Sequence, residues 1–237
     1  MTRAQTRDPR SLRPVKISLH PIKYAEGSAL IAMGDTRVLC AATVEPGRPR
    51  WMGQDPRGWI TAEYNMLPRA TLTRTRRERP NLSGRTQEIQ RLIGRSLRAV
   101  ADLAALDNFT VTLDCDVIQA DGGTRTAAIT GGYVALHLAC ARLLKSGAIA
   151  RFPLRDQVAA VSCGIFQGEL SLDLDYARDA KAEVDLNVVM TGEGTLCEVQ
   201  GTAEAKPFSR QTLEQMLDLA GQGIKELIAV QRKALKI

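Results

Sequence analysis

Residues 119–126, Gln-Ala-Asp-Gly-Gly-Thr-Arg-Thr, form the stretch of this sequence best suited to chemistry. They lie between an alternating, strand-like run at 109–117 and a long apolar run at 127–144. Two glycines allow successive backbone N–H groups to turn inward as a nest, and the first turn of a helix adds free N–H groups and a positive dipole. With the forked cation of Arg125, the stretch suits a compact anion such as phosphate. A plain strand-to-helix turn with a surface arginine is the alternative.

Capping residues indicate how this loop meets its helix. Thr124 is expected at the N-cap of the following helix or next to it. Arg85 is expected just before a second helix, which begins near Thr86, so it also can face an anion at a helix N-terminus. Glu88 lies three residues before Arg91, and a pair between these two side chains on the helix surface is the alternative account of Arg91.

A second group of reactive side chains is acidic and lies at 173–185. Asp179 falls in a polar link at 176–183, and Asp185 begins the apolar strand that follows. A carboxylate at a strand start beside a loop can hold Mg²⁺ or transfer a proton. Asp173 and Asp175 are expected to be solvated hairpin charges instead.

The charge is unevenly distributed along the chain. Residues 1–98 carry 19 Lys and Arg against 8 Asp and Glu, whereas residues 99–237 carry 13 against 18. Arginines gather in a polar loop at 68–84, at positions Arg69, Arg74, Arg76, Arg77 and Arg79. This arrangement favours a polyanion partner, because arginine makes bidentate contacts with phosphate. A merely solvated charged surface is the alternative.

Composition excludes several classes of function. There are only two histidines, no G-x-x-x-x-G-K-[ST] loop and no G-x-S-x-G motif. Paired-histidine nuclease, P-loop and serine-hydrolase chemistry are therefore not expected. The five scattered cysteines are typical of buried free thiols in a reducing cytoplasm. No apolar run is expected to span a membrane, and residues 1–13 are expected to be a mobile polar arm.

Apolar periodicity and turn residues predict the elements that position these side chains. Strands are predicted at 15–19, 28–33, 36–44, 59–64, 109–117, 158–165, 169–174, 186–191 and 195–200. Helices are predicted from about residue 86, over 124–144, and after an N-cap at Ser209. Glycine-containing turns at 34–35, 167–168 and 192–194 predict hairpins. Hairpins interspersed with helices indicate an α+β fold rather than a regular βαβ arrangement.

An anion site, a basic half and a pair of carboxylates together indicate phosphoryl transfer on a nucleic acid. The residues by themselves do not decide whether water or phosphate is the nucleophile.

The sequence resembles the bacterial ribonuclease PH family across almost its whole length. The matching stretches include 12–15, 25–28, 34–36, 58–64, 66–69, 84–86, 88–93, 113–117, 119–126 and 198–204. The resemblance implies an α+β fold like domain 2 of ribosomal protein S5, with mixed sheets packed with helices, as one domain over 1–237. It also implies a homohexameric ring built as a trimer of dimers, related to polynucleotide phosphorylase and exosome ring subunits.

The activity implied by the resemblance is phosphorolysis of RNA 3′ ends, mainly of tRNA precursors, in the cytoplasm and without a membrane. Inorganic phosphate is the co-substrate, nucleoside 5′-diphosphates are released, and the reaction is reversible. The resemblance implies phosphate binding by Arg85, Gly123, Thr124 and Arg125, catalysis and Mg²⁺ binding by Asp179 and Asp185, and RNA binding by Arg69, Arg74 and Arg77.

Several alternatives stay open. Asp185 is either a metal ligand or a general acid toward the departing 3′ oxygen. The arginine loop serves either RNA binding or contacts between subunits of the ring. The whole chain could also be a catalytically silent RNA-binding ring subunit or an S5-like ribosomal protein. Retention of both the Gly-Gly-Thr-Arg loop and the two aspartates argues against these last two readings.

Overall fold

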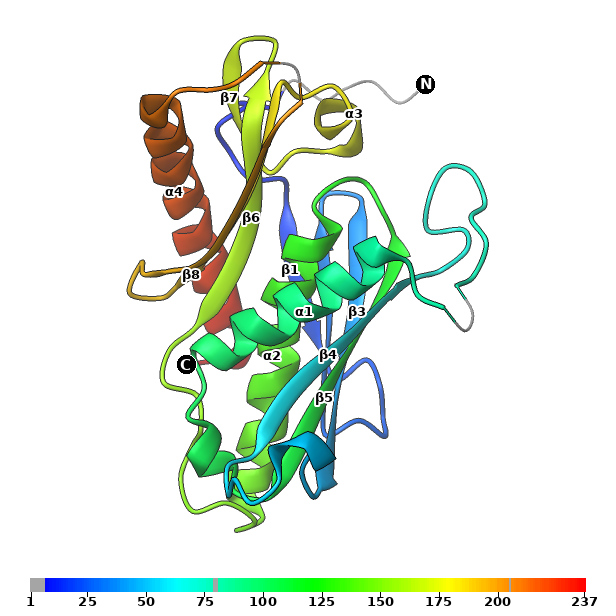
Figure 1. The fold of residues 1–237 in the computed structure, drawn as a ribbon, viewed down its shortest axis with the longest axis vertical. Helices are drawn as coiled ribbons and strands as arrows, with labels where there is room; N and C mark the ends of the chain where they lie inside the picture. Colours follow the sequence, from blue (N-terminus) through cyan, green and yellow to red (C-terminus); the bar gives the residue numbers. More distant parts are fainter. Residues whose placement is uncertain (1–6, 79–80, 205) are drawn as a thin grey trace.

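The computed structural model describes residues 7–78, 81–204 and 206–237, which form two β-sheets with helices packed against them (Figure 1). The strands are β1 (Val15–Leu19), β2 (Gly27–Met33), β3 (Thr36–Pro46), β4 (Trp59–Met66), β5 (Phe109–Gln119), β6 (Val158–Phe166), β7 (Glu169–Leu172), β8 (Val184–Thr191) and β9 (Leu196–Ala203). The helices are α1 (Gly84–Ala99), α2 (Thr124–Lys145), α3 (Tyr176–Asp179) and α4 (Arg210–Leu235), with short 3₁₀ turns η1 (Arg50–Met52) and η2 (Leu103–Leu106).

The first sheet has the strand order β1-β2-β3-β5-β4. Its pairs are antiparallel except β4 and β5, which run parallel. A parallel pair needs a crossover between its strands, and here the connection from β4 to β5 contains the arginine loop and α1. The crossover therefore brings the start of α1 to the same end of the sheet as the loop after β5.

The second sheet is antiparallel, with the order β7-β6-β8-β9. The predicted hairpins at 167–168 and 192–194 connect its neighbouring strands. In this register Asp185 of β8 lies opposite Gly164 of β6 and Thr202 of β9. The carboxylate of Asp185 thus projects from a central strand rather than from an edge.

Helix α2 packs against strands of both sheets, and α4 lies along β6 (Figure 1). A Cβ atom added at Gly27 of β2 would lie 2.1 Å from the carbonyl oxygen of Ala135, so glycine is what allows α2 to lie this close to the sheet. Buried residues from both sheets, α1, α2 and α4 form one hydrophobic core. This core fixes where α2 begins, and hence where the Gly-Gly loop lies.

No apolar run of the sequence is expected to span a membrane. By length and composition alone, however, α2 is sufficient for a membrane span. Of the apolar window, 72% is buried inside the protein, as is typical of the core helix of a soluble protein.

The five cysteines are free, as predicted, and Cys197 alone among them is only partly buried.

Helix α1 begins slightly earlier than predicted, and α2 begins at the predicted residue, Thr124. Helix α1 begins at Gly84, and the N-cap is Ser83, whose side chain accepts a hydrogen bond from the Thr86 N–H. Arg85 is therefore inside the first turn, not before it. The N-cap of α2 is Gly123 in a left-handed conformation, which glycine adopts without strain, so Thr124 is the first helical residue.

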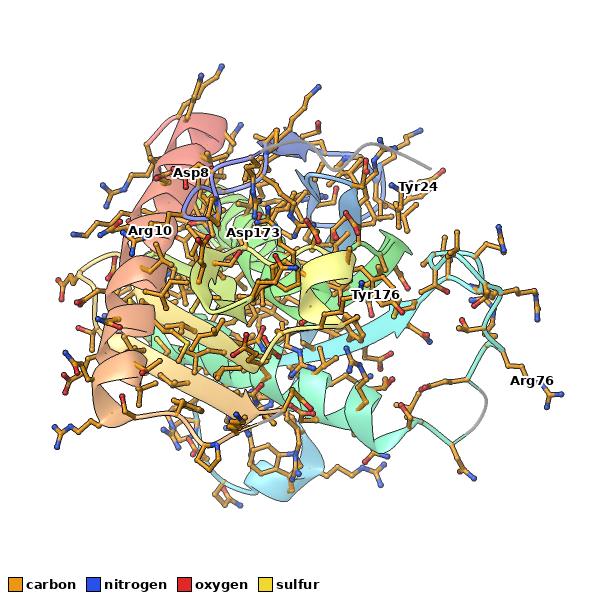
Figure 2. All side chains as sticks on the ribbon, turned by 90° about the horizontal axis from the view of Figure 1, so that it is seen from above. Asp8, Arg10, Tyr24, Arg76, Asp173 and Tyr176 are labelled. Carbon is orange, nitrogen blue, oxygen red and sulfur yellow. The ribbon has the colours of Figure 1, made fainter. Side chains whose placement is uncertain are left out.

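The prediction that Asp173 is a solvated hairpin charge is wrong. Strand β7 ends at Leu172, and Asp173 turns inward with a φ of 51° and is fully buried (Figure 2). A buried carboxylate needs a charged partner, and Arg13 and Arg7 provide it. Asp175 is half-buried and caps α3.

In place of the expected mobile arm, residues 7–13 are held against Asp173 through Arg7 and Arg13. Residues 1–6 lie outside the described residues.

Candidate active site

The loop between β5 and α2 presents free backbone donors. Gly122 and Gly123 both have positive φ, 71° and 65°. Within the described residues, the N–H groups of Gly122, Gly123 and Thr124 donate no hydrogen bond. A Cβ at Gly122 would lie 2.3 Å from the carbonyl oxygen of Leu174, so only glycine fits this position. We call these three N–H groups, with the side chains of Arg85 and Arg125, the anion cradle.

Arg125 lies in the first turn of α2 and is directed toward α1 and β9. Its Nη1 donates to Glu88 Oε1 at 3.2 Å and to Gln200 Oε1 at 3.1 Å, and its side chain is only 17% exposed. Among the described residues Glu88 forms its ion pair with Arg125 rather than with Arg91, the alternative that its spacing allowed. The first turns of α1 and α2 lie close enough for Glu88 to bond Arg125 instead, which the sequence spacing within α1 could not reveal.

The charges of Arg85 and Arg125 both act on Asp179, at the end of the short helix α3. Burial raises the pKa of the Asp179 carboxyl, and the positive charges of Arg85 and Arg125 oppose that rise. The segment around Asp179 was predicted to be a polar link, and it contains one helical turn, α3. Residues from three segments far apart in the sequence thus share one electrostatic environment.

Asp185 lies beside Asp179. Burial raises the pKa of Asp185 to about 6, and the charge of Asp179 adds to the rise, while Arg125 lowers it. Its Oδ2 accepts a hydrogen bond from Asn187 Nδ2 at 3.3 Å, but Oδ1 is buried without a hydrogen-bond partner among the described residues. An unpartnered buried carboxylate oxygen is costly, and it is placed to accept a ligand.

Tyr64 supports the start of α2 from the first sheet. Its hydroxyl and the Thr124 hydroxyl are 2.8 Å apart, and both side chains are buried. Burial raises the pKa of the Tyr64 phenol, although the Thr124 hydroxyl and the charges of Arg85 and Arg125 oppose that rise. The neutral phenol therefore holds the Thr124 side chain in one position at the cradle.

Strand β9 connects the site to both helices. Gln200 lies opposite Asn187 in the β8–β9 pair, so both side chains project from the face that carries Asp185. Two residues earlier, Glu198 forms an ion pair of 2.6 Å with Arg95 of α1. Strand β9 thus contacts α1 at Arg95, toward the C-terminal end of that helix, and α2 at Arg125 in its first turn.

Two carboxylates fit a magnesium site of a particular kind. Within residues 7–78, 81–204 and 206–237, no three His, Cys, Asp or Glu side chains cluster closely enough to hold a metal by themselves. Mg²⁺ commonly takes one or two carboxylates and completes its shell with water and substrate phosphate. The buried, unpartnered Oδ1 of Asp185 and the neighbouring Asp179 match that donor set.

The three arginines predicted to bind RNA are not part of the anion cradle. Arg69, Arg74 and Arg77 are exposed on the loop between β4 and α1, which projects from the body of the molecule, as the position of Arg76 shows (Figure 2). Arg69 Nη1 donates to the carbonyl oxygen of Leu72 at 3.0 Å. Arg79, in the same loop, lies outside the described residues.

Sequence reasoning missed several side chains that build the site. They are Arg13, Thr36, Glu88, Asp173, Asn187 and Gln200. Arg13 and Asp173 are 160 residues apart in the chain, and no local pattern links them. Tyr64 had a local signal, because it is the one residue with a polar tip among the core-facing positions Ile60, Ala62 and Tyr64 of an alternating strand.

The sequence matches models of the two domains of the 3′ exoribonuclease family, domain 1 over residues 11–141 and domain 2 over residues 156–223. It is similar to ribonuclease PH of Moorella thermoacetica, with 60% identity over 237 residues, covering 99% of this chain and 95% of the relative. Ribonuclease PH of Methylobacterium radiotolerans is 56% identical over 228 residues, covering 94% and 95%.

Solved structures share the fold at low sequence identity. Rice (Oryza sativa) Rrp46 superposes with a TM-score of 0.79 at 23% identity, covering 98% of this chain and all of that one. The Archaeoglobus fulgidus exosome with RNA bound to the active site gives a TM-score of 0.81 at 21% identity, covering 94% and 90%. The α+β fold class is thereby confirmed. Because the family models of domain 1 and domain 2 both match, and relatives above 50% identity cover nearly the whole length, this chain belongs to the 3′ exoribonuclease family.

Proposed function

We propose that the anion cradle binds the inorganic phosphate that this phosphorolytic 3′-to-5′ exoribonuclease uses as its nucleophile. The observation that carries the proposal is a group of unpaired N–H donors at the start of α2, where the charges of Arg125 and of Arg85 at the start of α1 both act on the carboxylate of Asp179. The ribonuclease PH relatives support the activity. The chain is thus a tRNA nucleotidyltransferase that removes 3′-terminal nucleotides of RNA.

In the reaction, a phosphate oxygen attacks the phosphorus of the last phosphodiester. The bond from that phosphorus to the 3′ oxygen of the preceding nucleotide breaks, and the 3′ oxygen takes a proton. The products are a nucleoside 5′-diphosphate and an RNA one nucleotide shorter. Two anions must approach each other, so the charges of Arg85 and Arg125 and the backbone donors are needed to neutralise phosphate and hold it in line.

Asp179 and Asp185 are the proposed catalytic carboxylates and the residues that would hold Mg²⁺. Mg²⁺ bound there would supply charge stabilisation on the scissile phosphoryl group. Asp185 has a second role open to it: with a pKa raised to about 6, its carboxyl can also give a proton to the departing 3′ oxygen.

The exposed arginine loop is the proposed RNA contact. Arg69, Arg74 and Arg77 would bind phosphates of the RNA strand, which carry no sequence information. Precursors of tRNA with extended 3′ ends are the proposed main substrate, and the cytoplasm the proposed location. One hydrophobic core that includes residues of both sheets supports treating residues 1–237 as a single domain.

A homohexameric ring, built as a trimer of dimers, is the proposed assembly. Its support is the fold shared with the Archaeoglobus fulgidus exosome with RNA bound to the active site and with an archaeal exosome core. Arg77 also lies near enough to Asp116 of the same chain to lower the pKa of that carboxyl against the effect of burial. Arg69, Arg74 and Arg77 are exposed, and are therefore open to RNA or to a neighbouring subunit.

The decisive experiment is product identity on a short labelled RNA, with inorganic phosphate first removed completely and then restored. Phosphorolysis predicts no degradation without phosphate, saturable dependence on phosphate, and nucleoside diphosphate as product. With nucleoside diphosphates and little phosphate, the RNA should be extended at its 3′ end. Nucleoside monophosphate formed equally in both conditions would mean hydrolysis. RNA binding without any turnover would mean a silent ring subunit.

A further inference from the structure

Arg13, in the segment before β1, is buried and connects Asp173 to the cradle loop. Its Nε and Nη2 donate to the two carboxylate oxygens of Asp173 at 2.9 and 2.7 Å, and its backbone N–H donates to Oδ2 at 2.9 Å. From the other edge of the guanidinium, Nη1 donates to the carbonyl oxygen of Asp121, and Nη2 to that of Gly122 at 3.3 Å. Asp173 thus orients a fork that holds two successive carbonyls.

The orientation of those carbonyls decides where the next N–H groups point. In a trans peptide the C=O and the N–H point in opposite directions. Holding the carbonyls of Asp121 and Gly122 toward Arg13 therefore directs the N–H groups of Gly122 and Gly123 away from it. These are two of the unpaired donors of the cradle, and two glycines in the left-handed region have no side chain of their own to fix that orientation.

From the side of β3, Thr36 holds one of these peptides, Gly122–Gly123, and also the preceding Ala120–Asp121 peptide. Its hydroxyl donates to the carbonyl oxygen of Gly122 at 2.6 Å and accepts from the N–H of Asp121 at 2.9 Å. The Thr36 side chain is fully buried. The carbonyl of Gly122 is therefore held by two donors, Arg13 and Thr36, on the side of the peptide opposite to the N–H of Gly123.

The same loop also positions the start of α3. The Asp121 carboxylate accepts from the N–H of Tyr176 at 3.2 Å, and the backbone of residues 174–176 lies within 2.9 Å of where a Cβ of Gly122 would be. Helix α3 carries Asp179, so the network that orients the cradle donors also supports the segment that holds this carboxylate.

We propose that Arg13 and Thr36 are positioning residues for phosphate, which act by turning the N–H groups of Gly122 and Gly123 into the cradle. This inference rests on the proposed phosphate site. It assigns a role in phosphate affinity to two residues that do not contact phosphate themselves. A purely structural role would instead lower stability without changing phosphate affinity selectively.

The test uses conservative variants of the full-length protein. Arg13→Lys keeps a charge for buried Asp173 but cannot hold two carbonyls as a fork. Thr36→Val keeps the shape and removes the hydroxyl, while Thr36→Ser keeps the hydroxyl. Arg7→Lys is the matched control, because Arg7 bonds the carbonyls of Leu172 and Asp173 but not the cradle loop. Phosphate KM, kcat at saturating phosphate, RNA Kd and Tm are measured for each.

We expect Arg13→Lys and Thr36→Val to raise the phosphate KM by about tenfold, with kcat and RNA Kd within about threefold of the parent, as for loss of one or two supporting hydrogen bonds. Thr36→Ser should recover most of the phosphate affinity that Thr36→Val loses, and Arg7→Lys should leave the phosphate KM unchanged. If Arg13→Lys does not fold, the comparison of Thr36→Val with Thr36→Ser decides.

An unchanged phosphate KM in Thr36→Val, with or without a lower Tm, would overturn the proposal. So would equal effects of Thr36→Val and Thr36→Ser, which would indicate packing rather than hydrogen bonding. These failures are distinct from failure of the proposed function. If Arg125→Ala weakens phosphate binding while Thr36→Val does not, the cradle stands and only the positioning role falls; if neither variant nor the removal of phosphate affects turnover, the phosphate site itself is wrong.

Discussion

Arg125 and Glu88 join the first turns of α2 and α1 through a single ion pair of 3.2 Å. Without phosphate, the cation that should bind it is therefore partly neutralised by a carboxylate of the neighbouring helix. Gln200 bonds the same nitrogen at 3.1 Å, so Arg125 stays oriented even when Glu88 is changed. This arrangement trades some phosphate affinity for a fixed guanidinium.

Glu88→Gln should strengthen phosphate binding. The amide keeps an acceptor oxygen near Arg125 but removes a negative charge beside the incoming anion. Because Glu88 is 49% exposed and solvent screens its charge, we expect only about a two- to fivefold lower phosphate KM. Phosphate saturation kinetics at low ionic strength measure it. A higher KM would show that the charge of Glu88 is needed to orient Arg125.

Arg125→Ala should slow turnover by on the order of 10²-fold and raise the phosphate requirement, as for loss of one transition-state donor. RNA affinity should change far less, since the arginine loop is separate. Arg142→Ala, in the last turn of the same helix, is the control for general effects on α2. Unchanged phosphate saturation kinetics in Arg125→Ala would remove Arg125 from the cradle.

Asp185→Asn should abolish most activity while fold and RNA binding persist, because the amide is nearly isosteric but neither binds Mg²⁺ well nor gives a proton. Turnover is measured at saturating RNA and phosphate with Mg²⁺ present, and RNA Kd is measured separately. Near-normal turnover in this variant would make Asp185 a structural residue.

The same substitution should stabilise the protein at high pH when metal is absent. The folded-state pKa of Asp185, about 6, lies above its ordinary value of 3.8, so the folded protein holds this proton more tightly than the unfolded chain does. Ionisation of Asp185 therefore lowers the free energy of unfolding as pH rises from 3.8 to about 6, and this loss of stability is complete above about 6. Asp185→Asn should gain up to about 3 kcal/mol at pH 8, falling to about a third of that at pH 4.5.

Urea unfolding of parent and variant in phosphate-free buffer with a chelator measures this difference, since bound Mg²⁺ would stabilise the ionised parent. A variant less stable than the parent at pH 8 would contradict the buried, unpartnered position of Oδ1.

Arg74→Ala should weaken RNA binding by a similar factor for different RNA sequences and reduce the salt slope of log Kd by about one. Arg69→Ala and Arg77→Ala should behave alike. Arg210→Ala is the control, because Arg210 is equally solvent-exposed, at 91%, but lies at the start of α4. Oligomeric state is measured in parallel; a variant that loses its assembly but binds RNA normally would assign the loop to subunit contacts.

The sequence by itself determined the elements and the chemical types of the site. Alternation and turn residues predicted the strands of both sheets, because side-chain period and glycine turns are local properties. The Gly-Gly-Thr-Arg stretch indicated an anion site for the same reason: positive φ, free N–H groups and a helix start all follow from adjacent residues. The resemblance supplied the roles of Asp179 and Asp185, which spacing alone left open.

Only the tertiary structure decided which of these groups meet and what holds them. Glu88 pairs with Arg125 of another helix instead of with Arg91, and Asp173 is buried against Arg13 instead of solvated. Both outcomes depend on contacts between residues 37 and 160 positions apart, set by the close packing of α2 and by the path of residues 7–13. Local patterns carry no information about such pairs, because the energy of a buried charge depends on the partner that the whole fold brings to it.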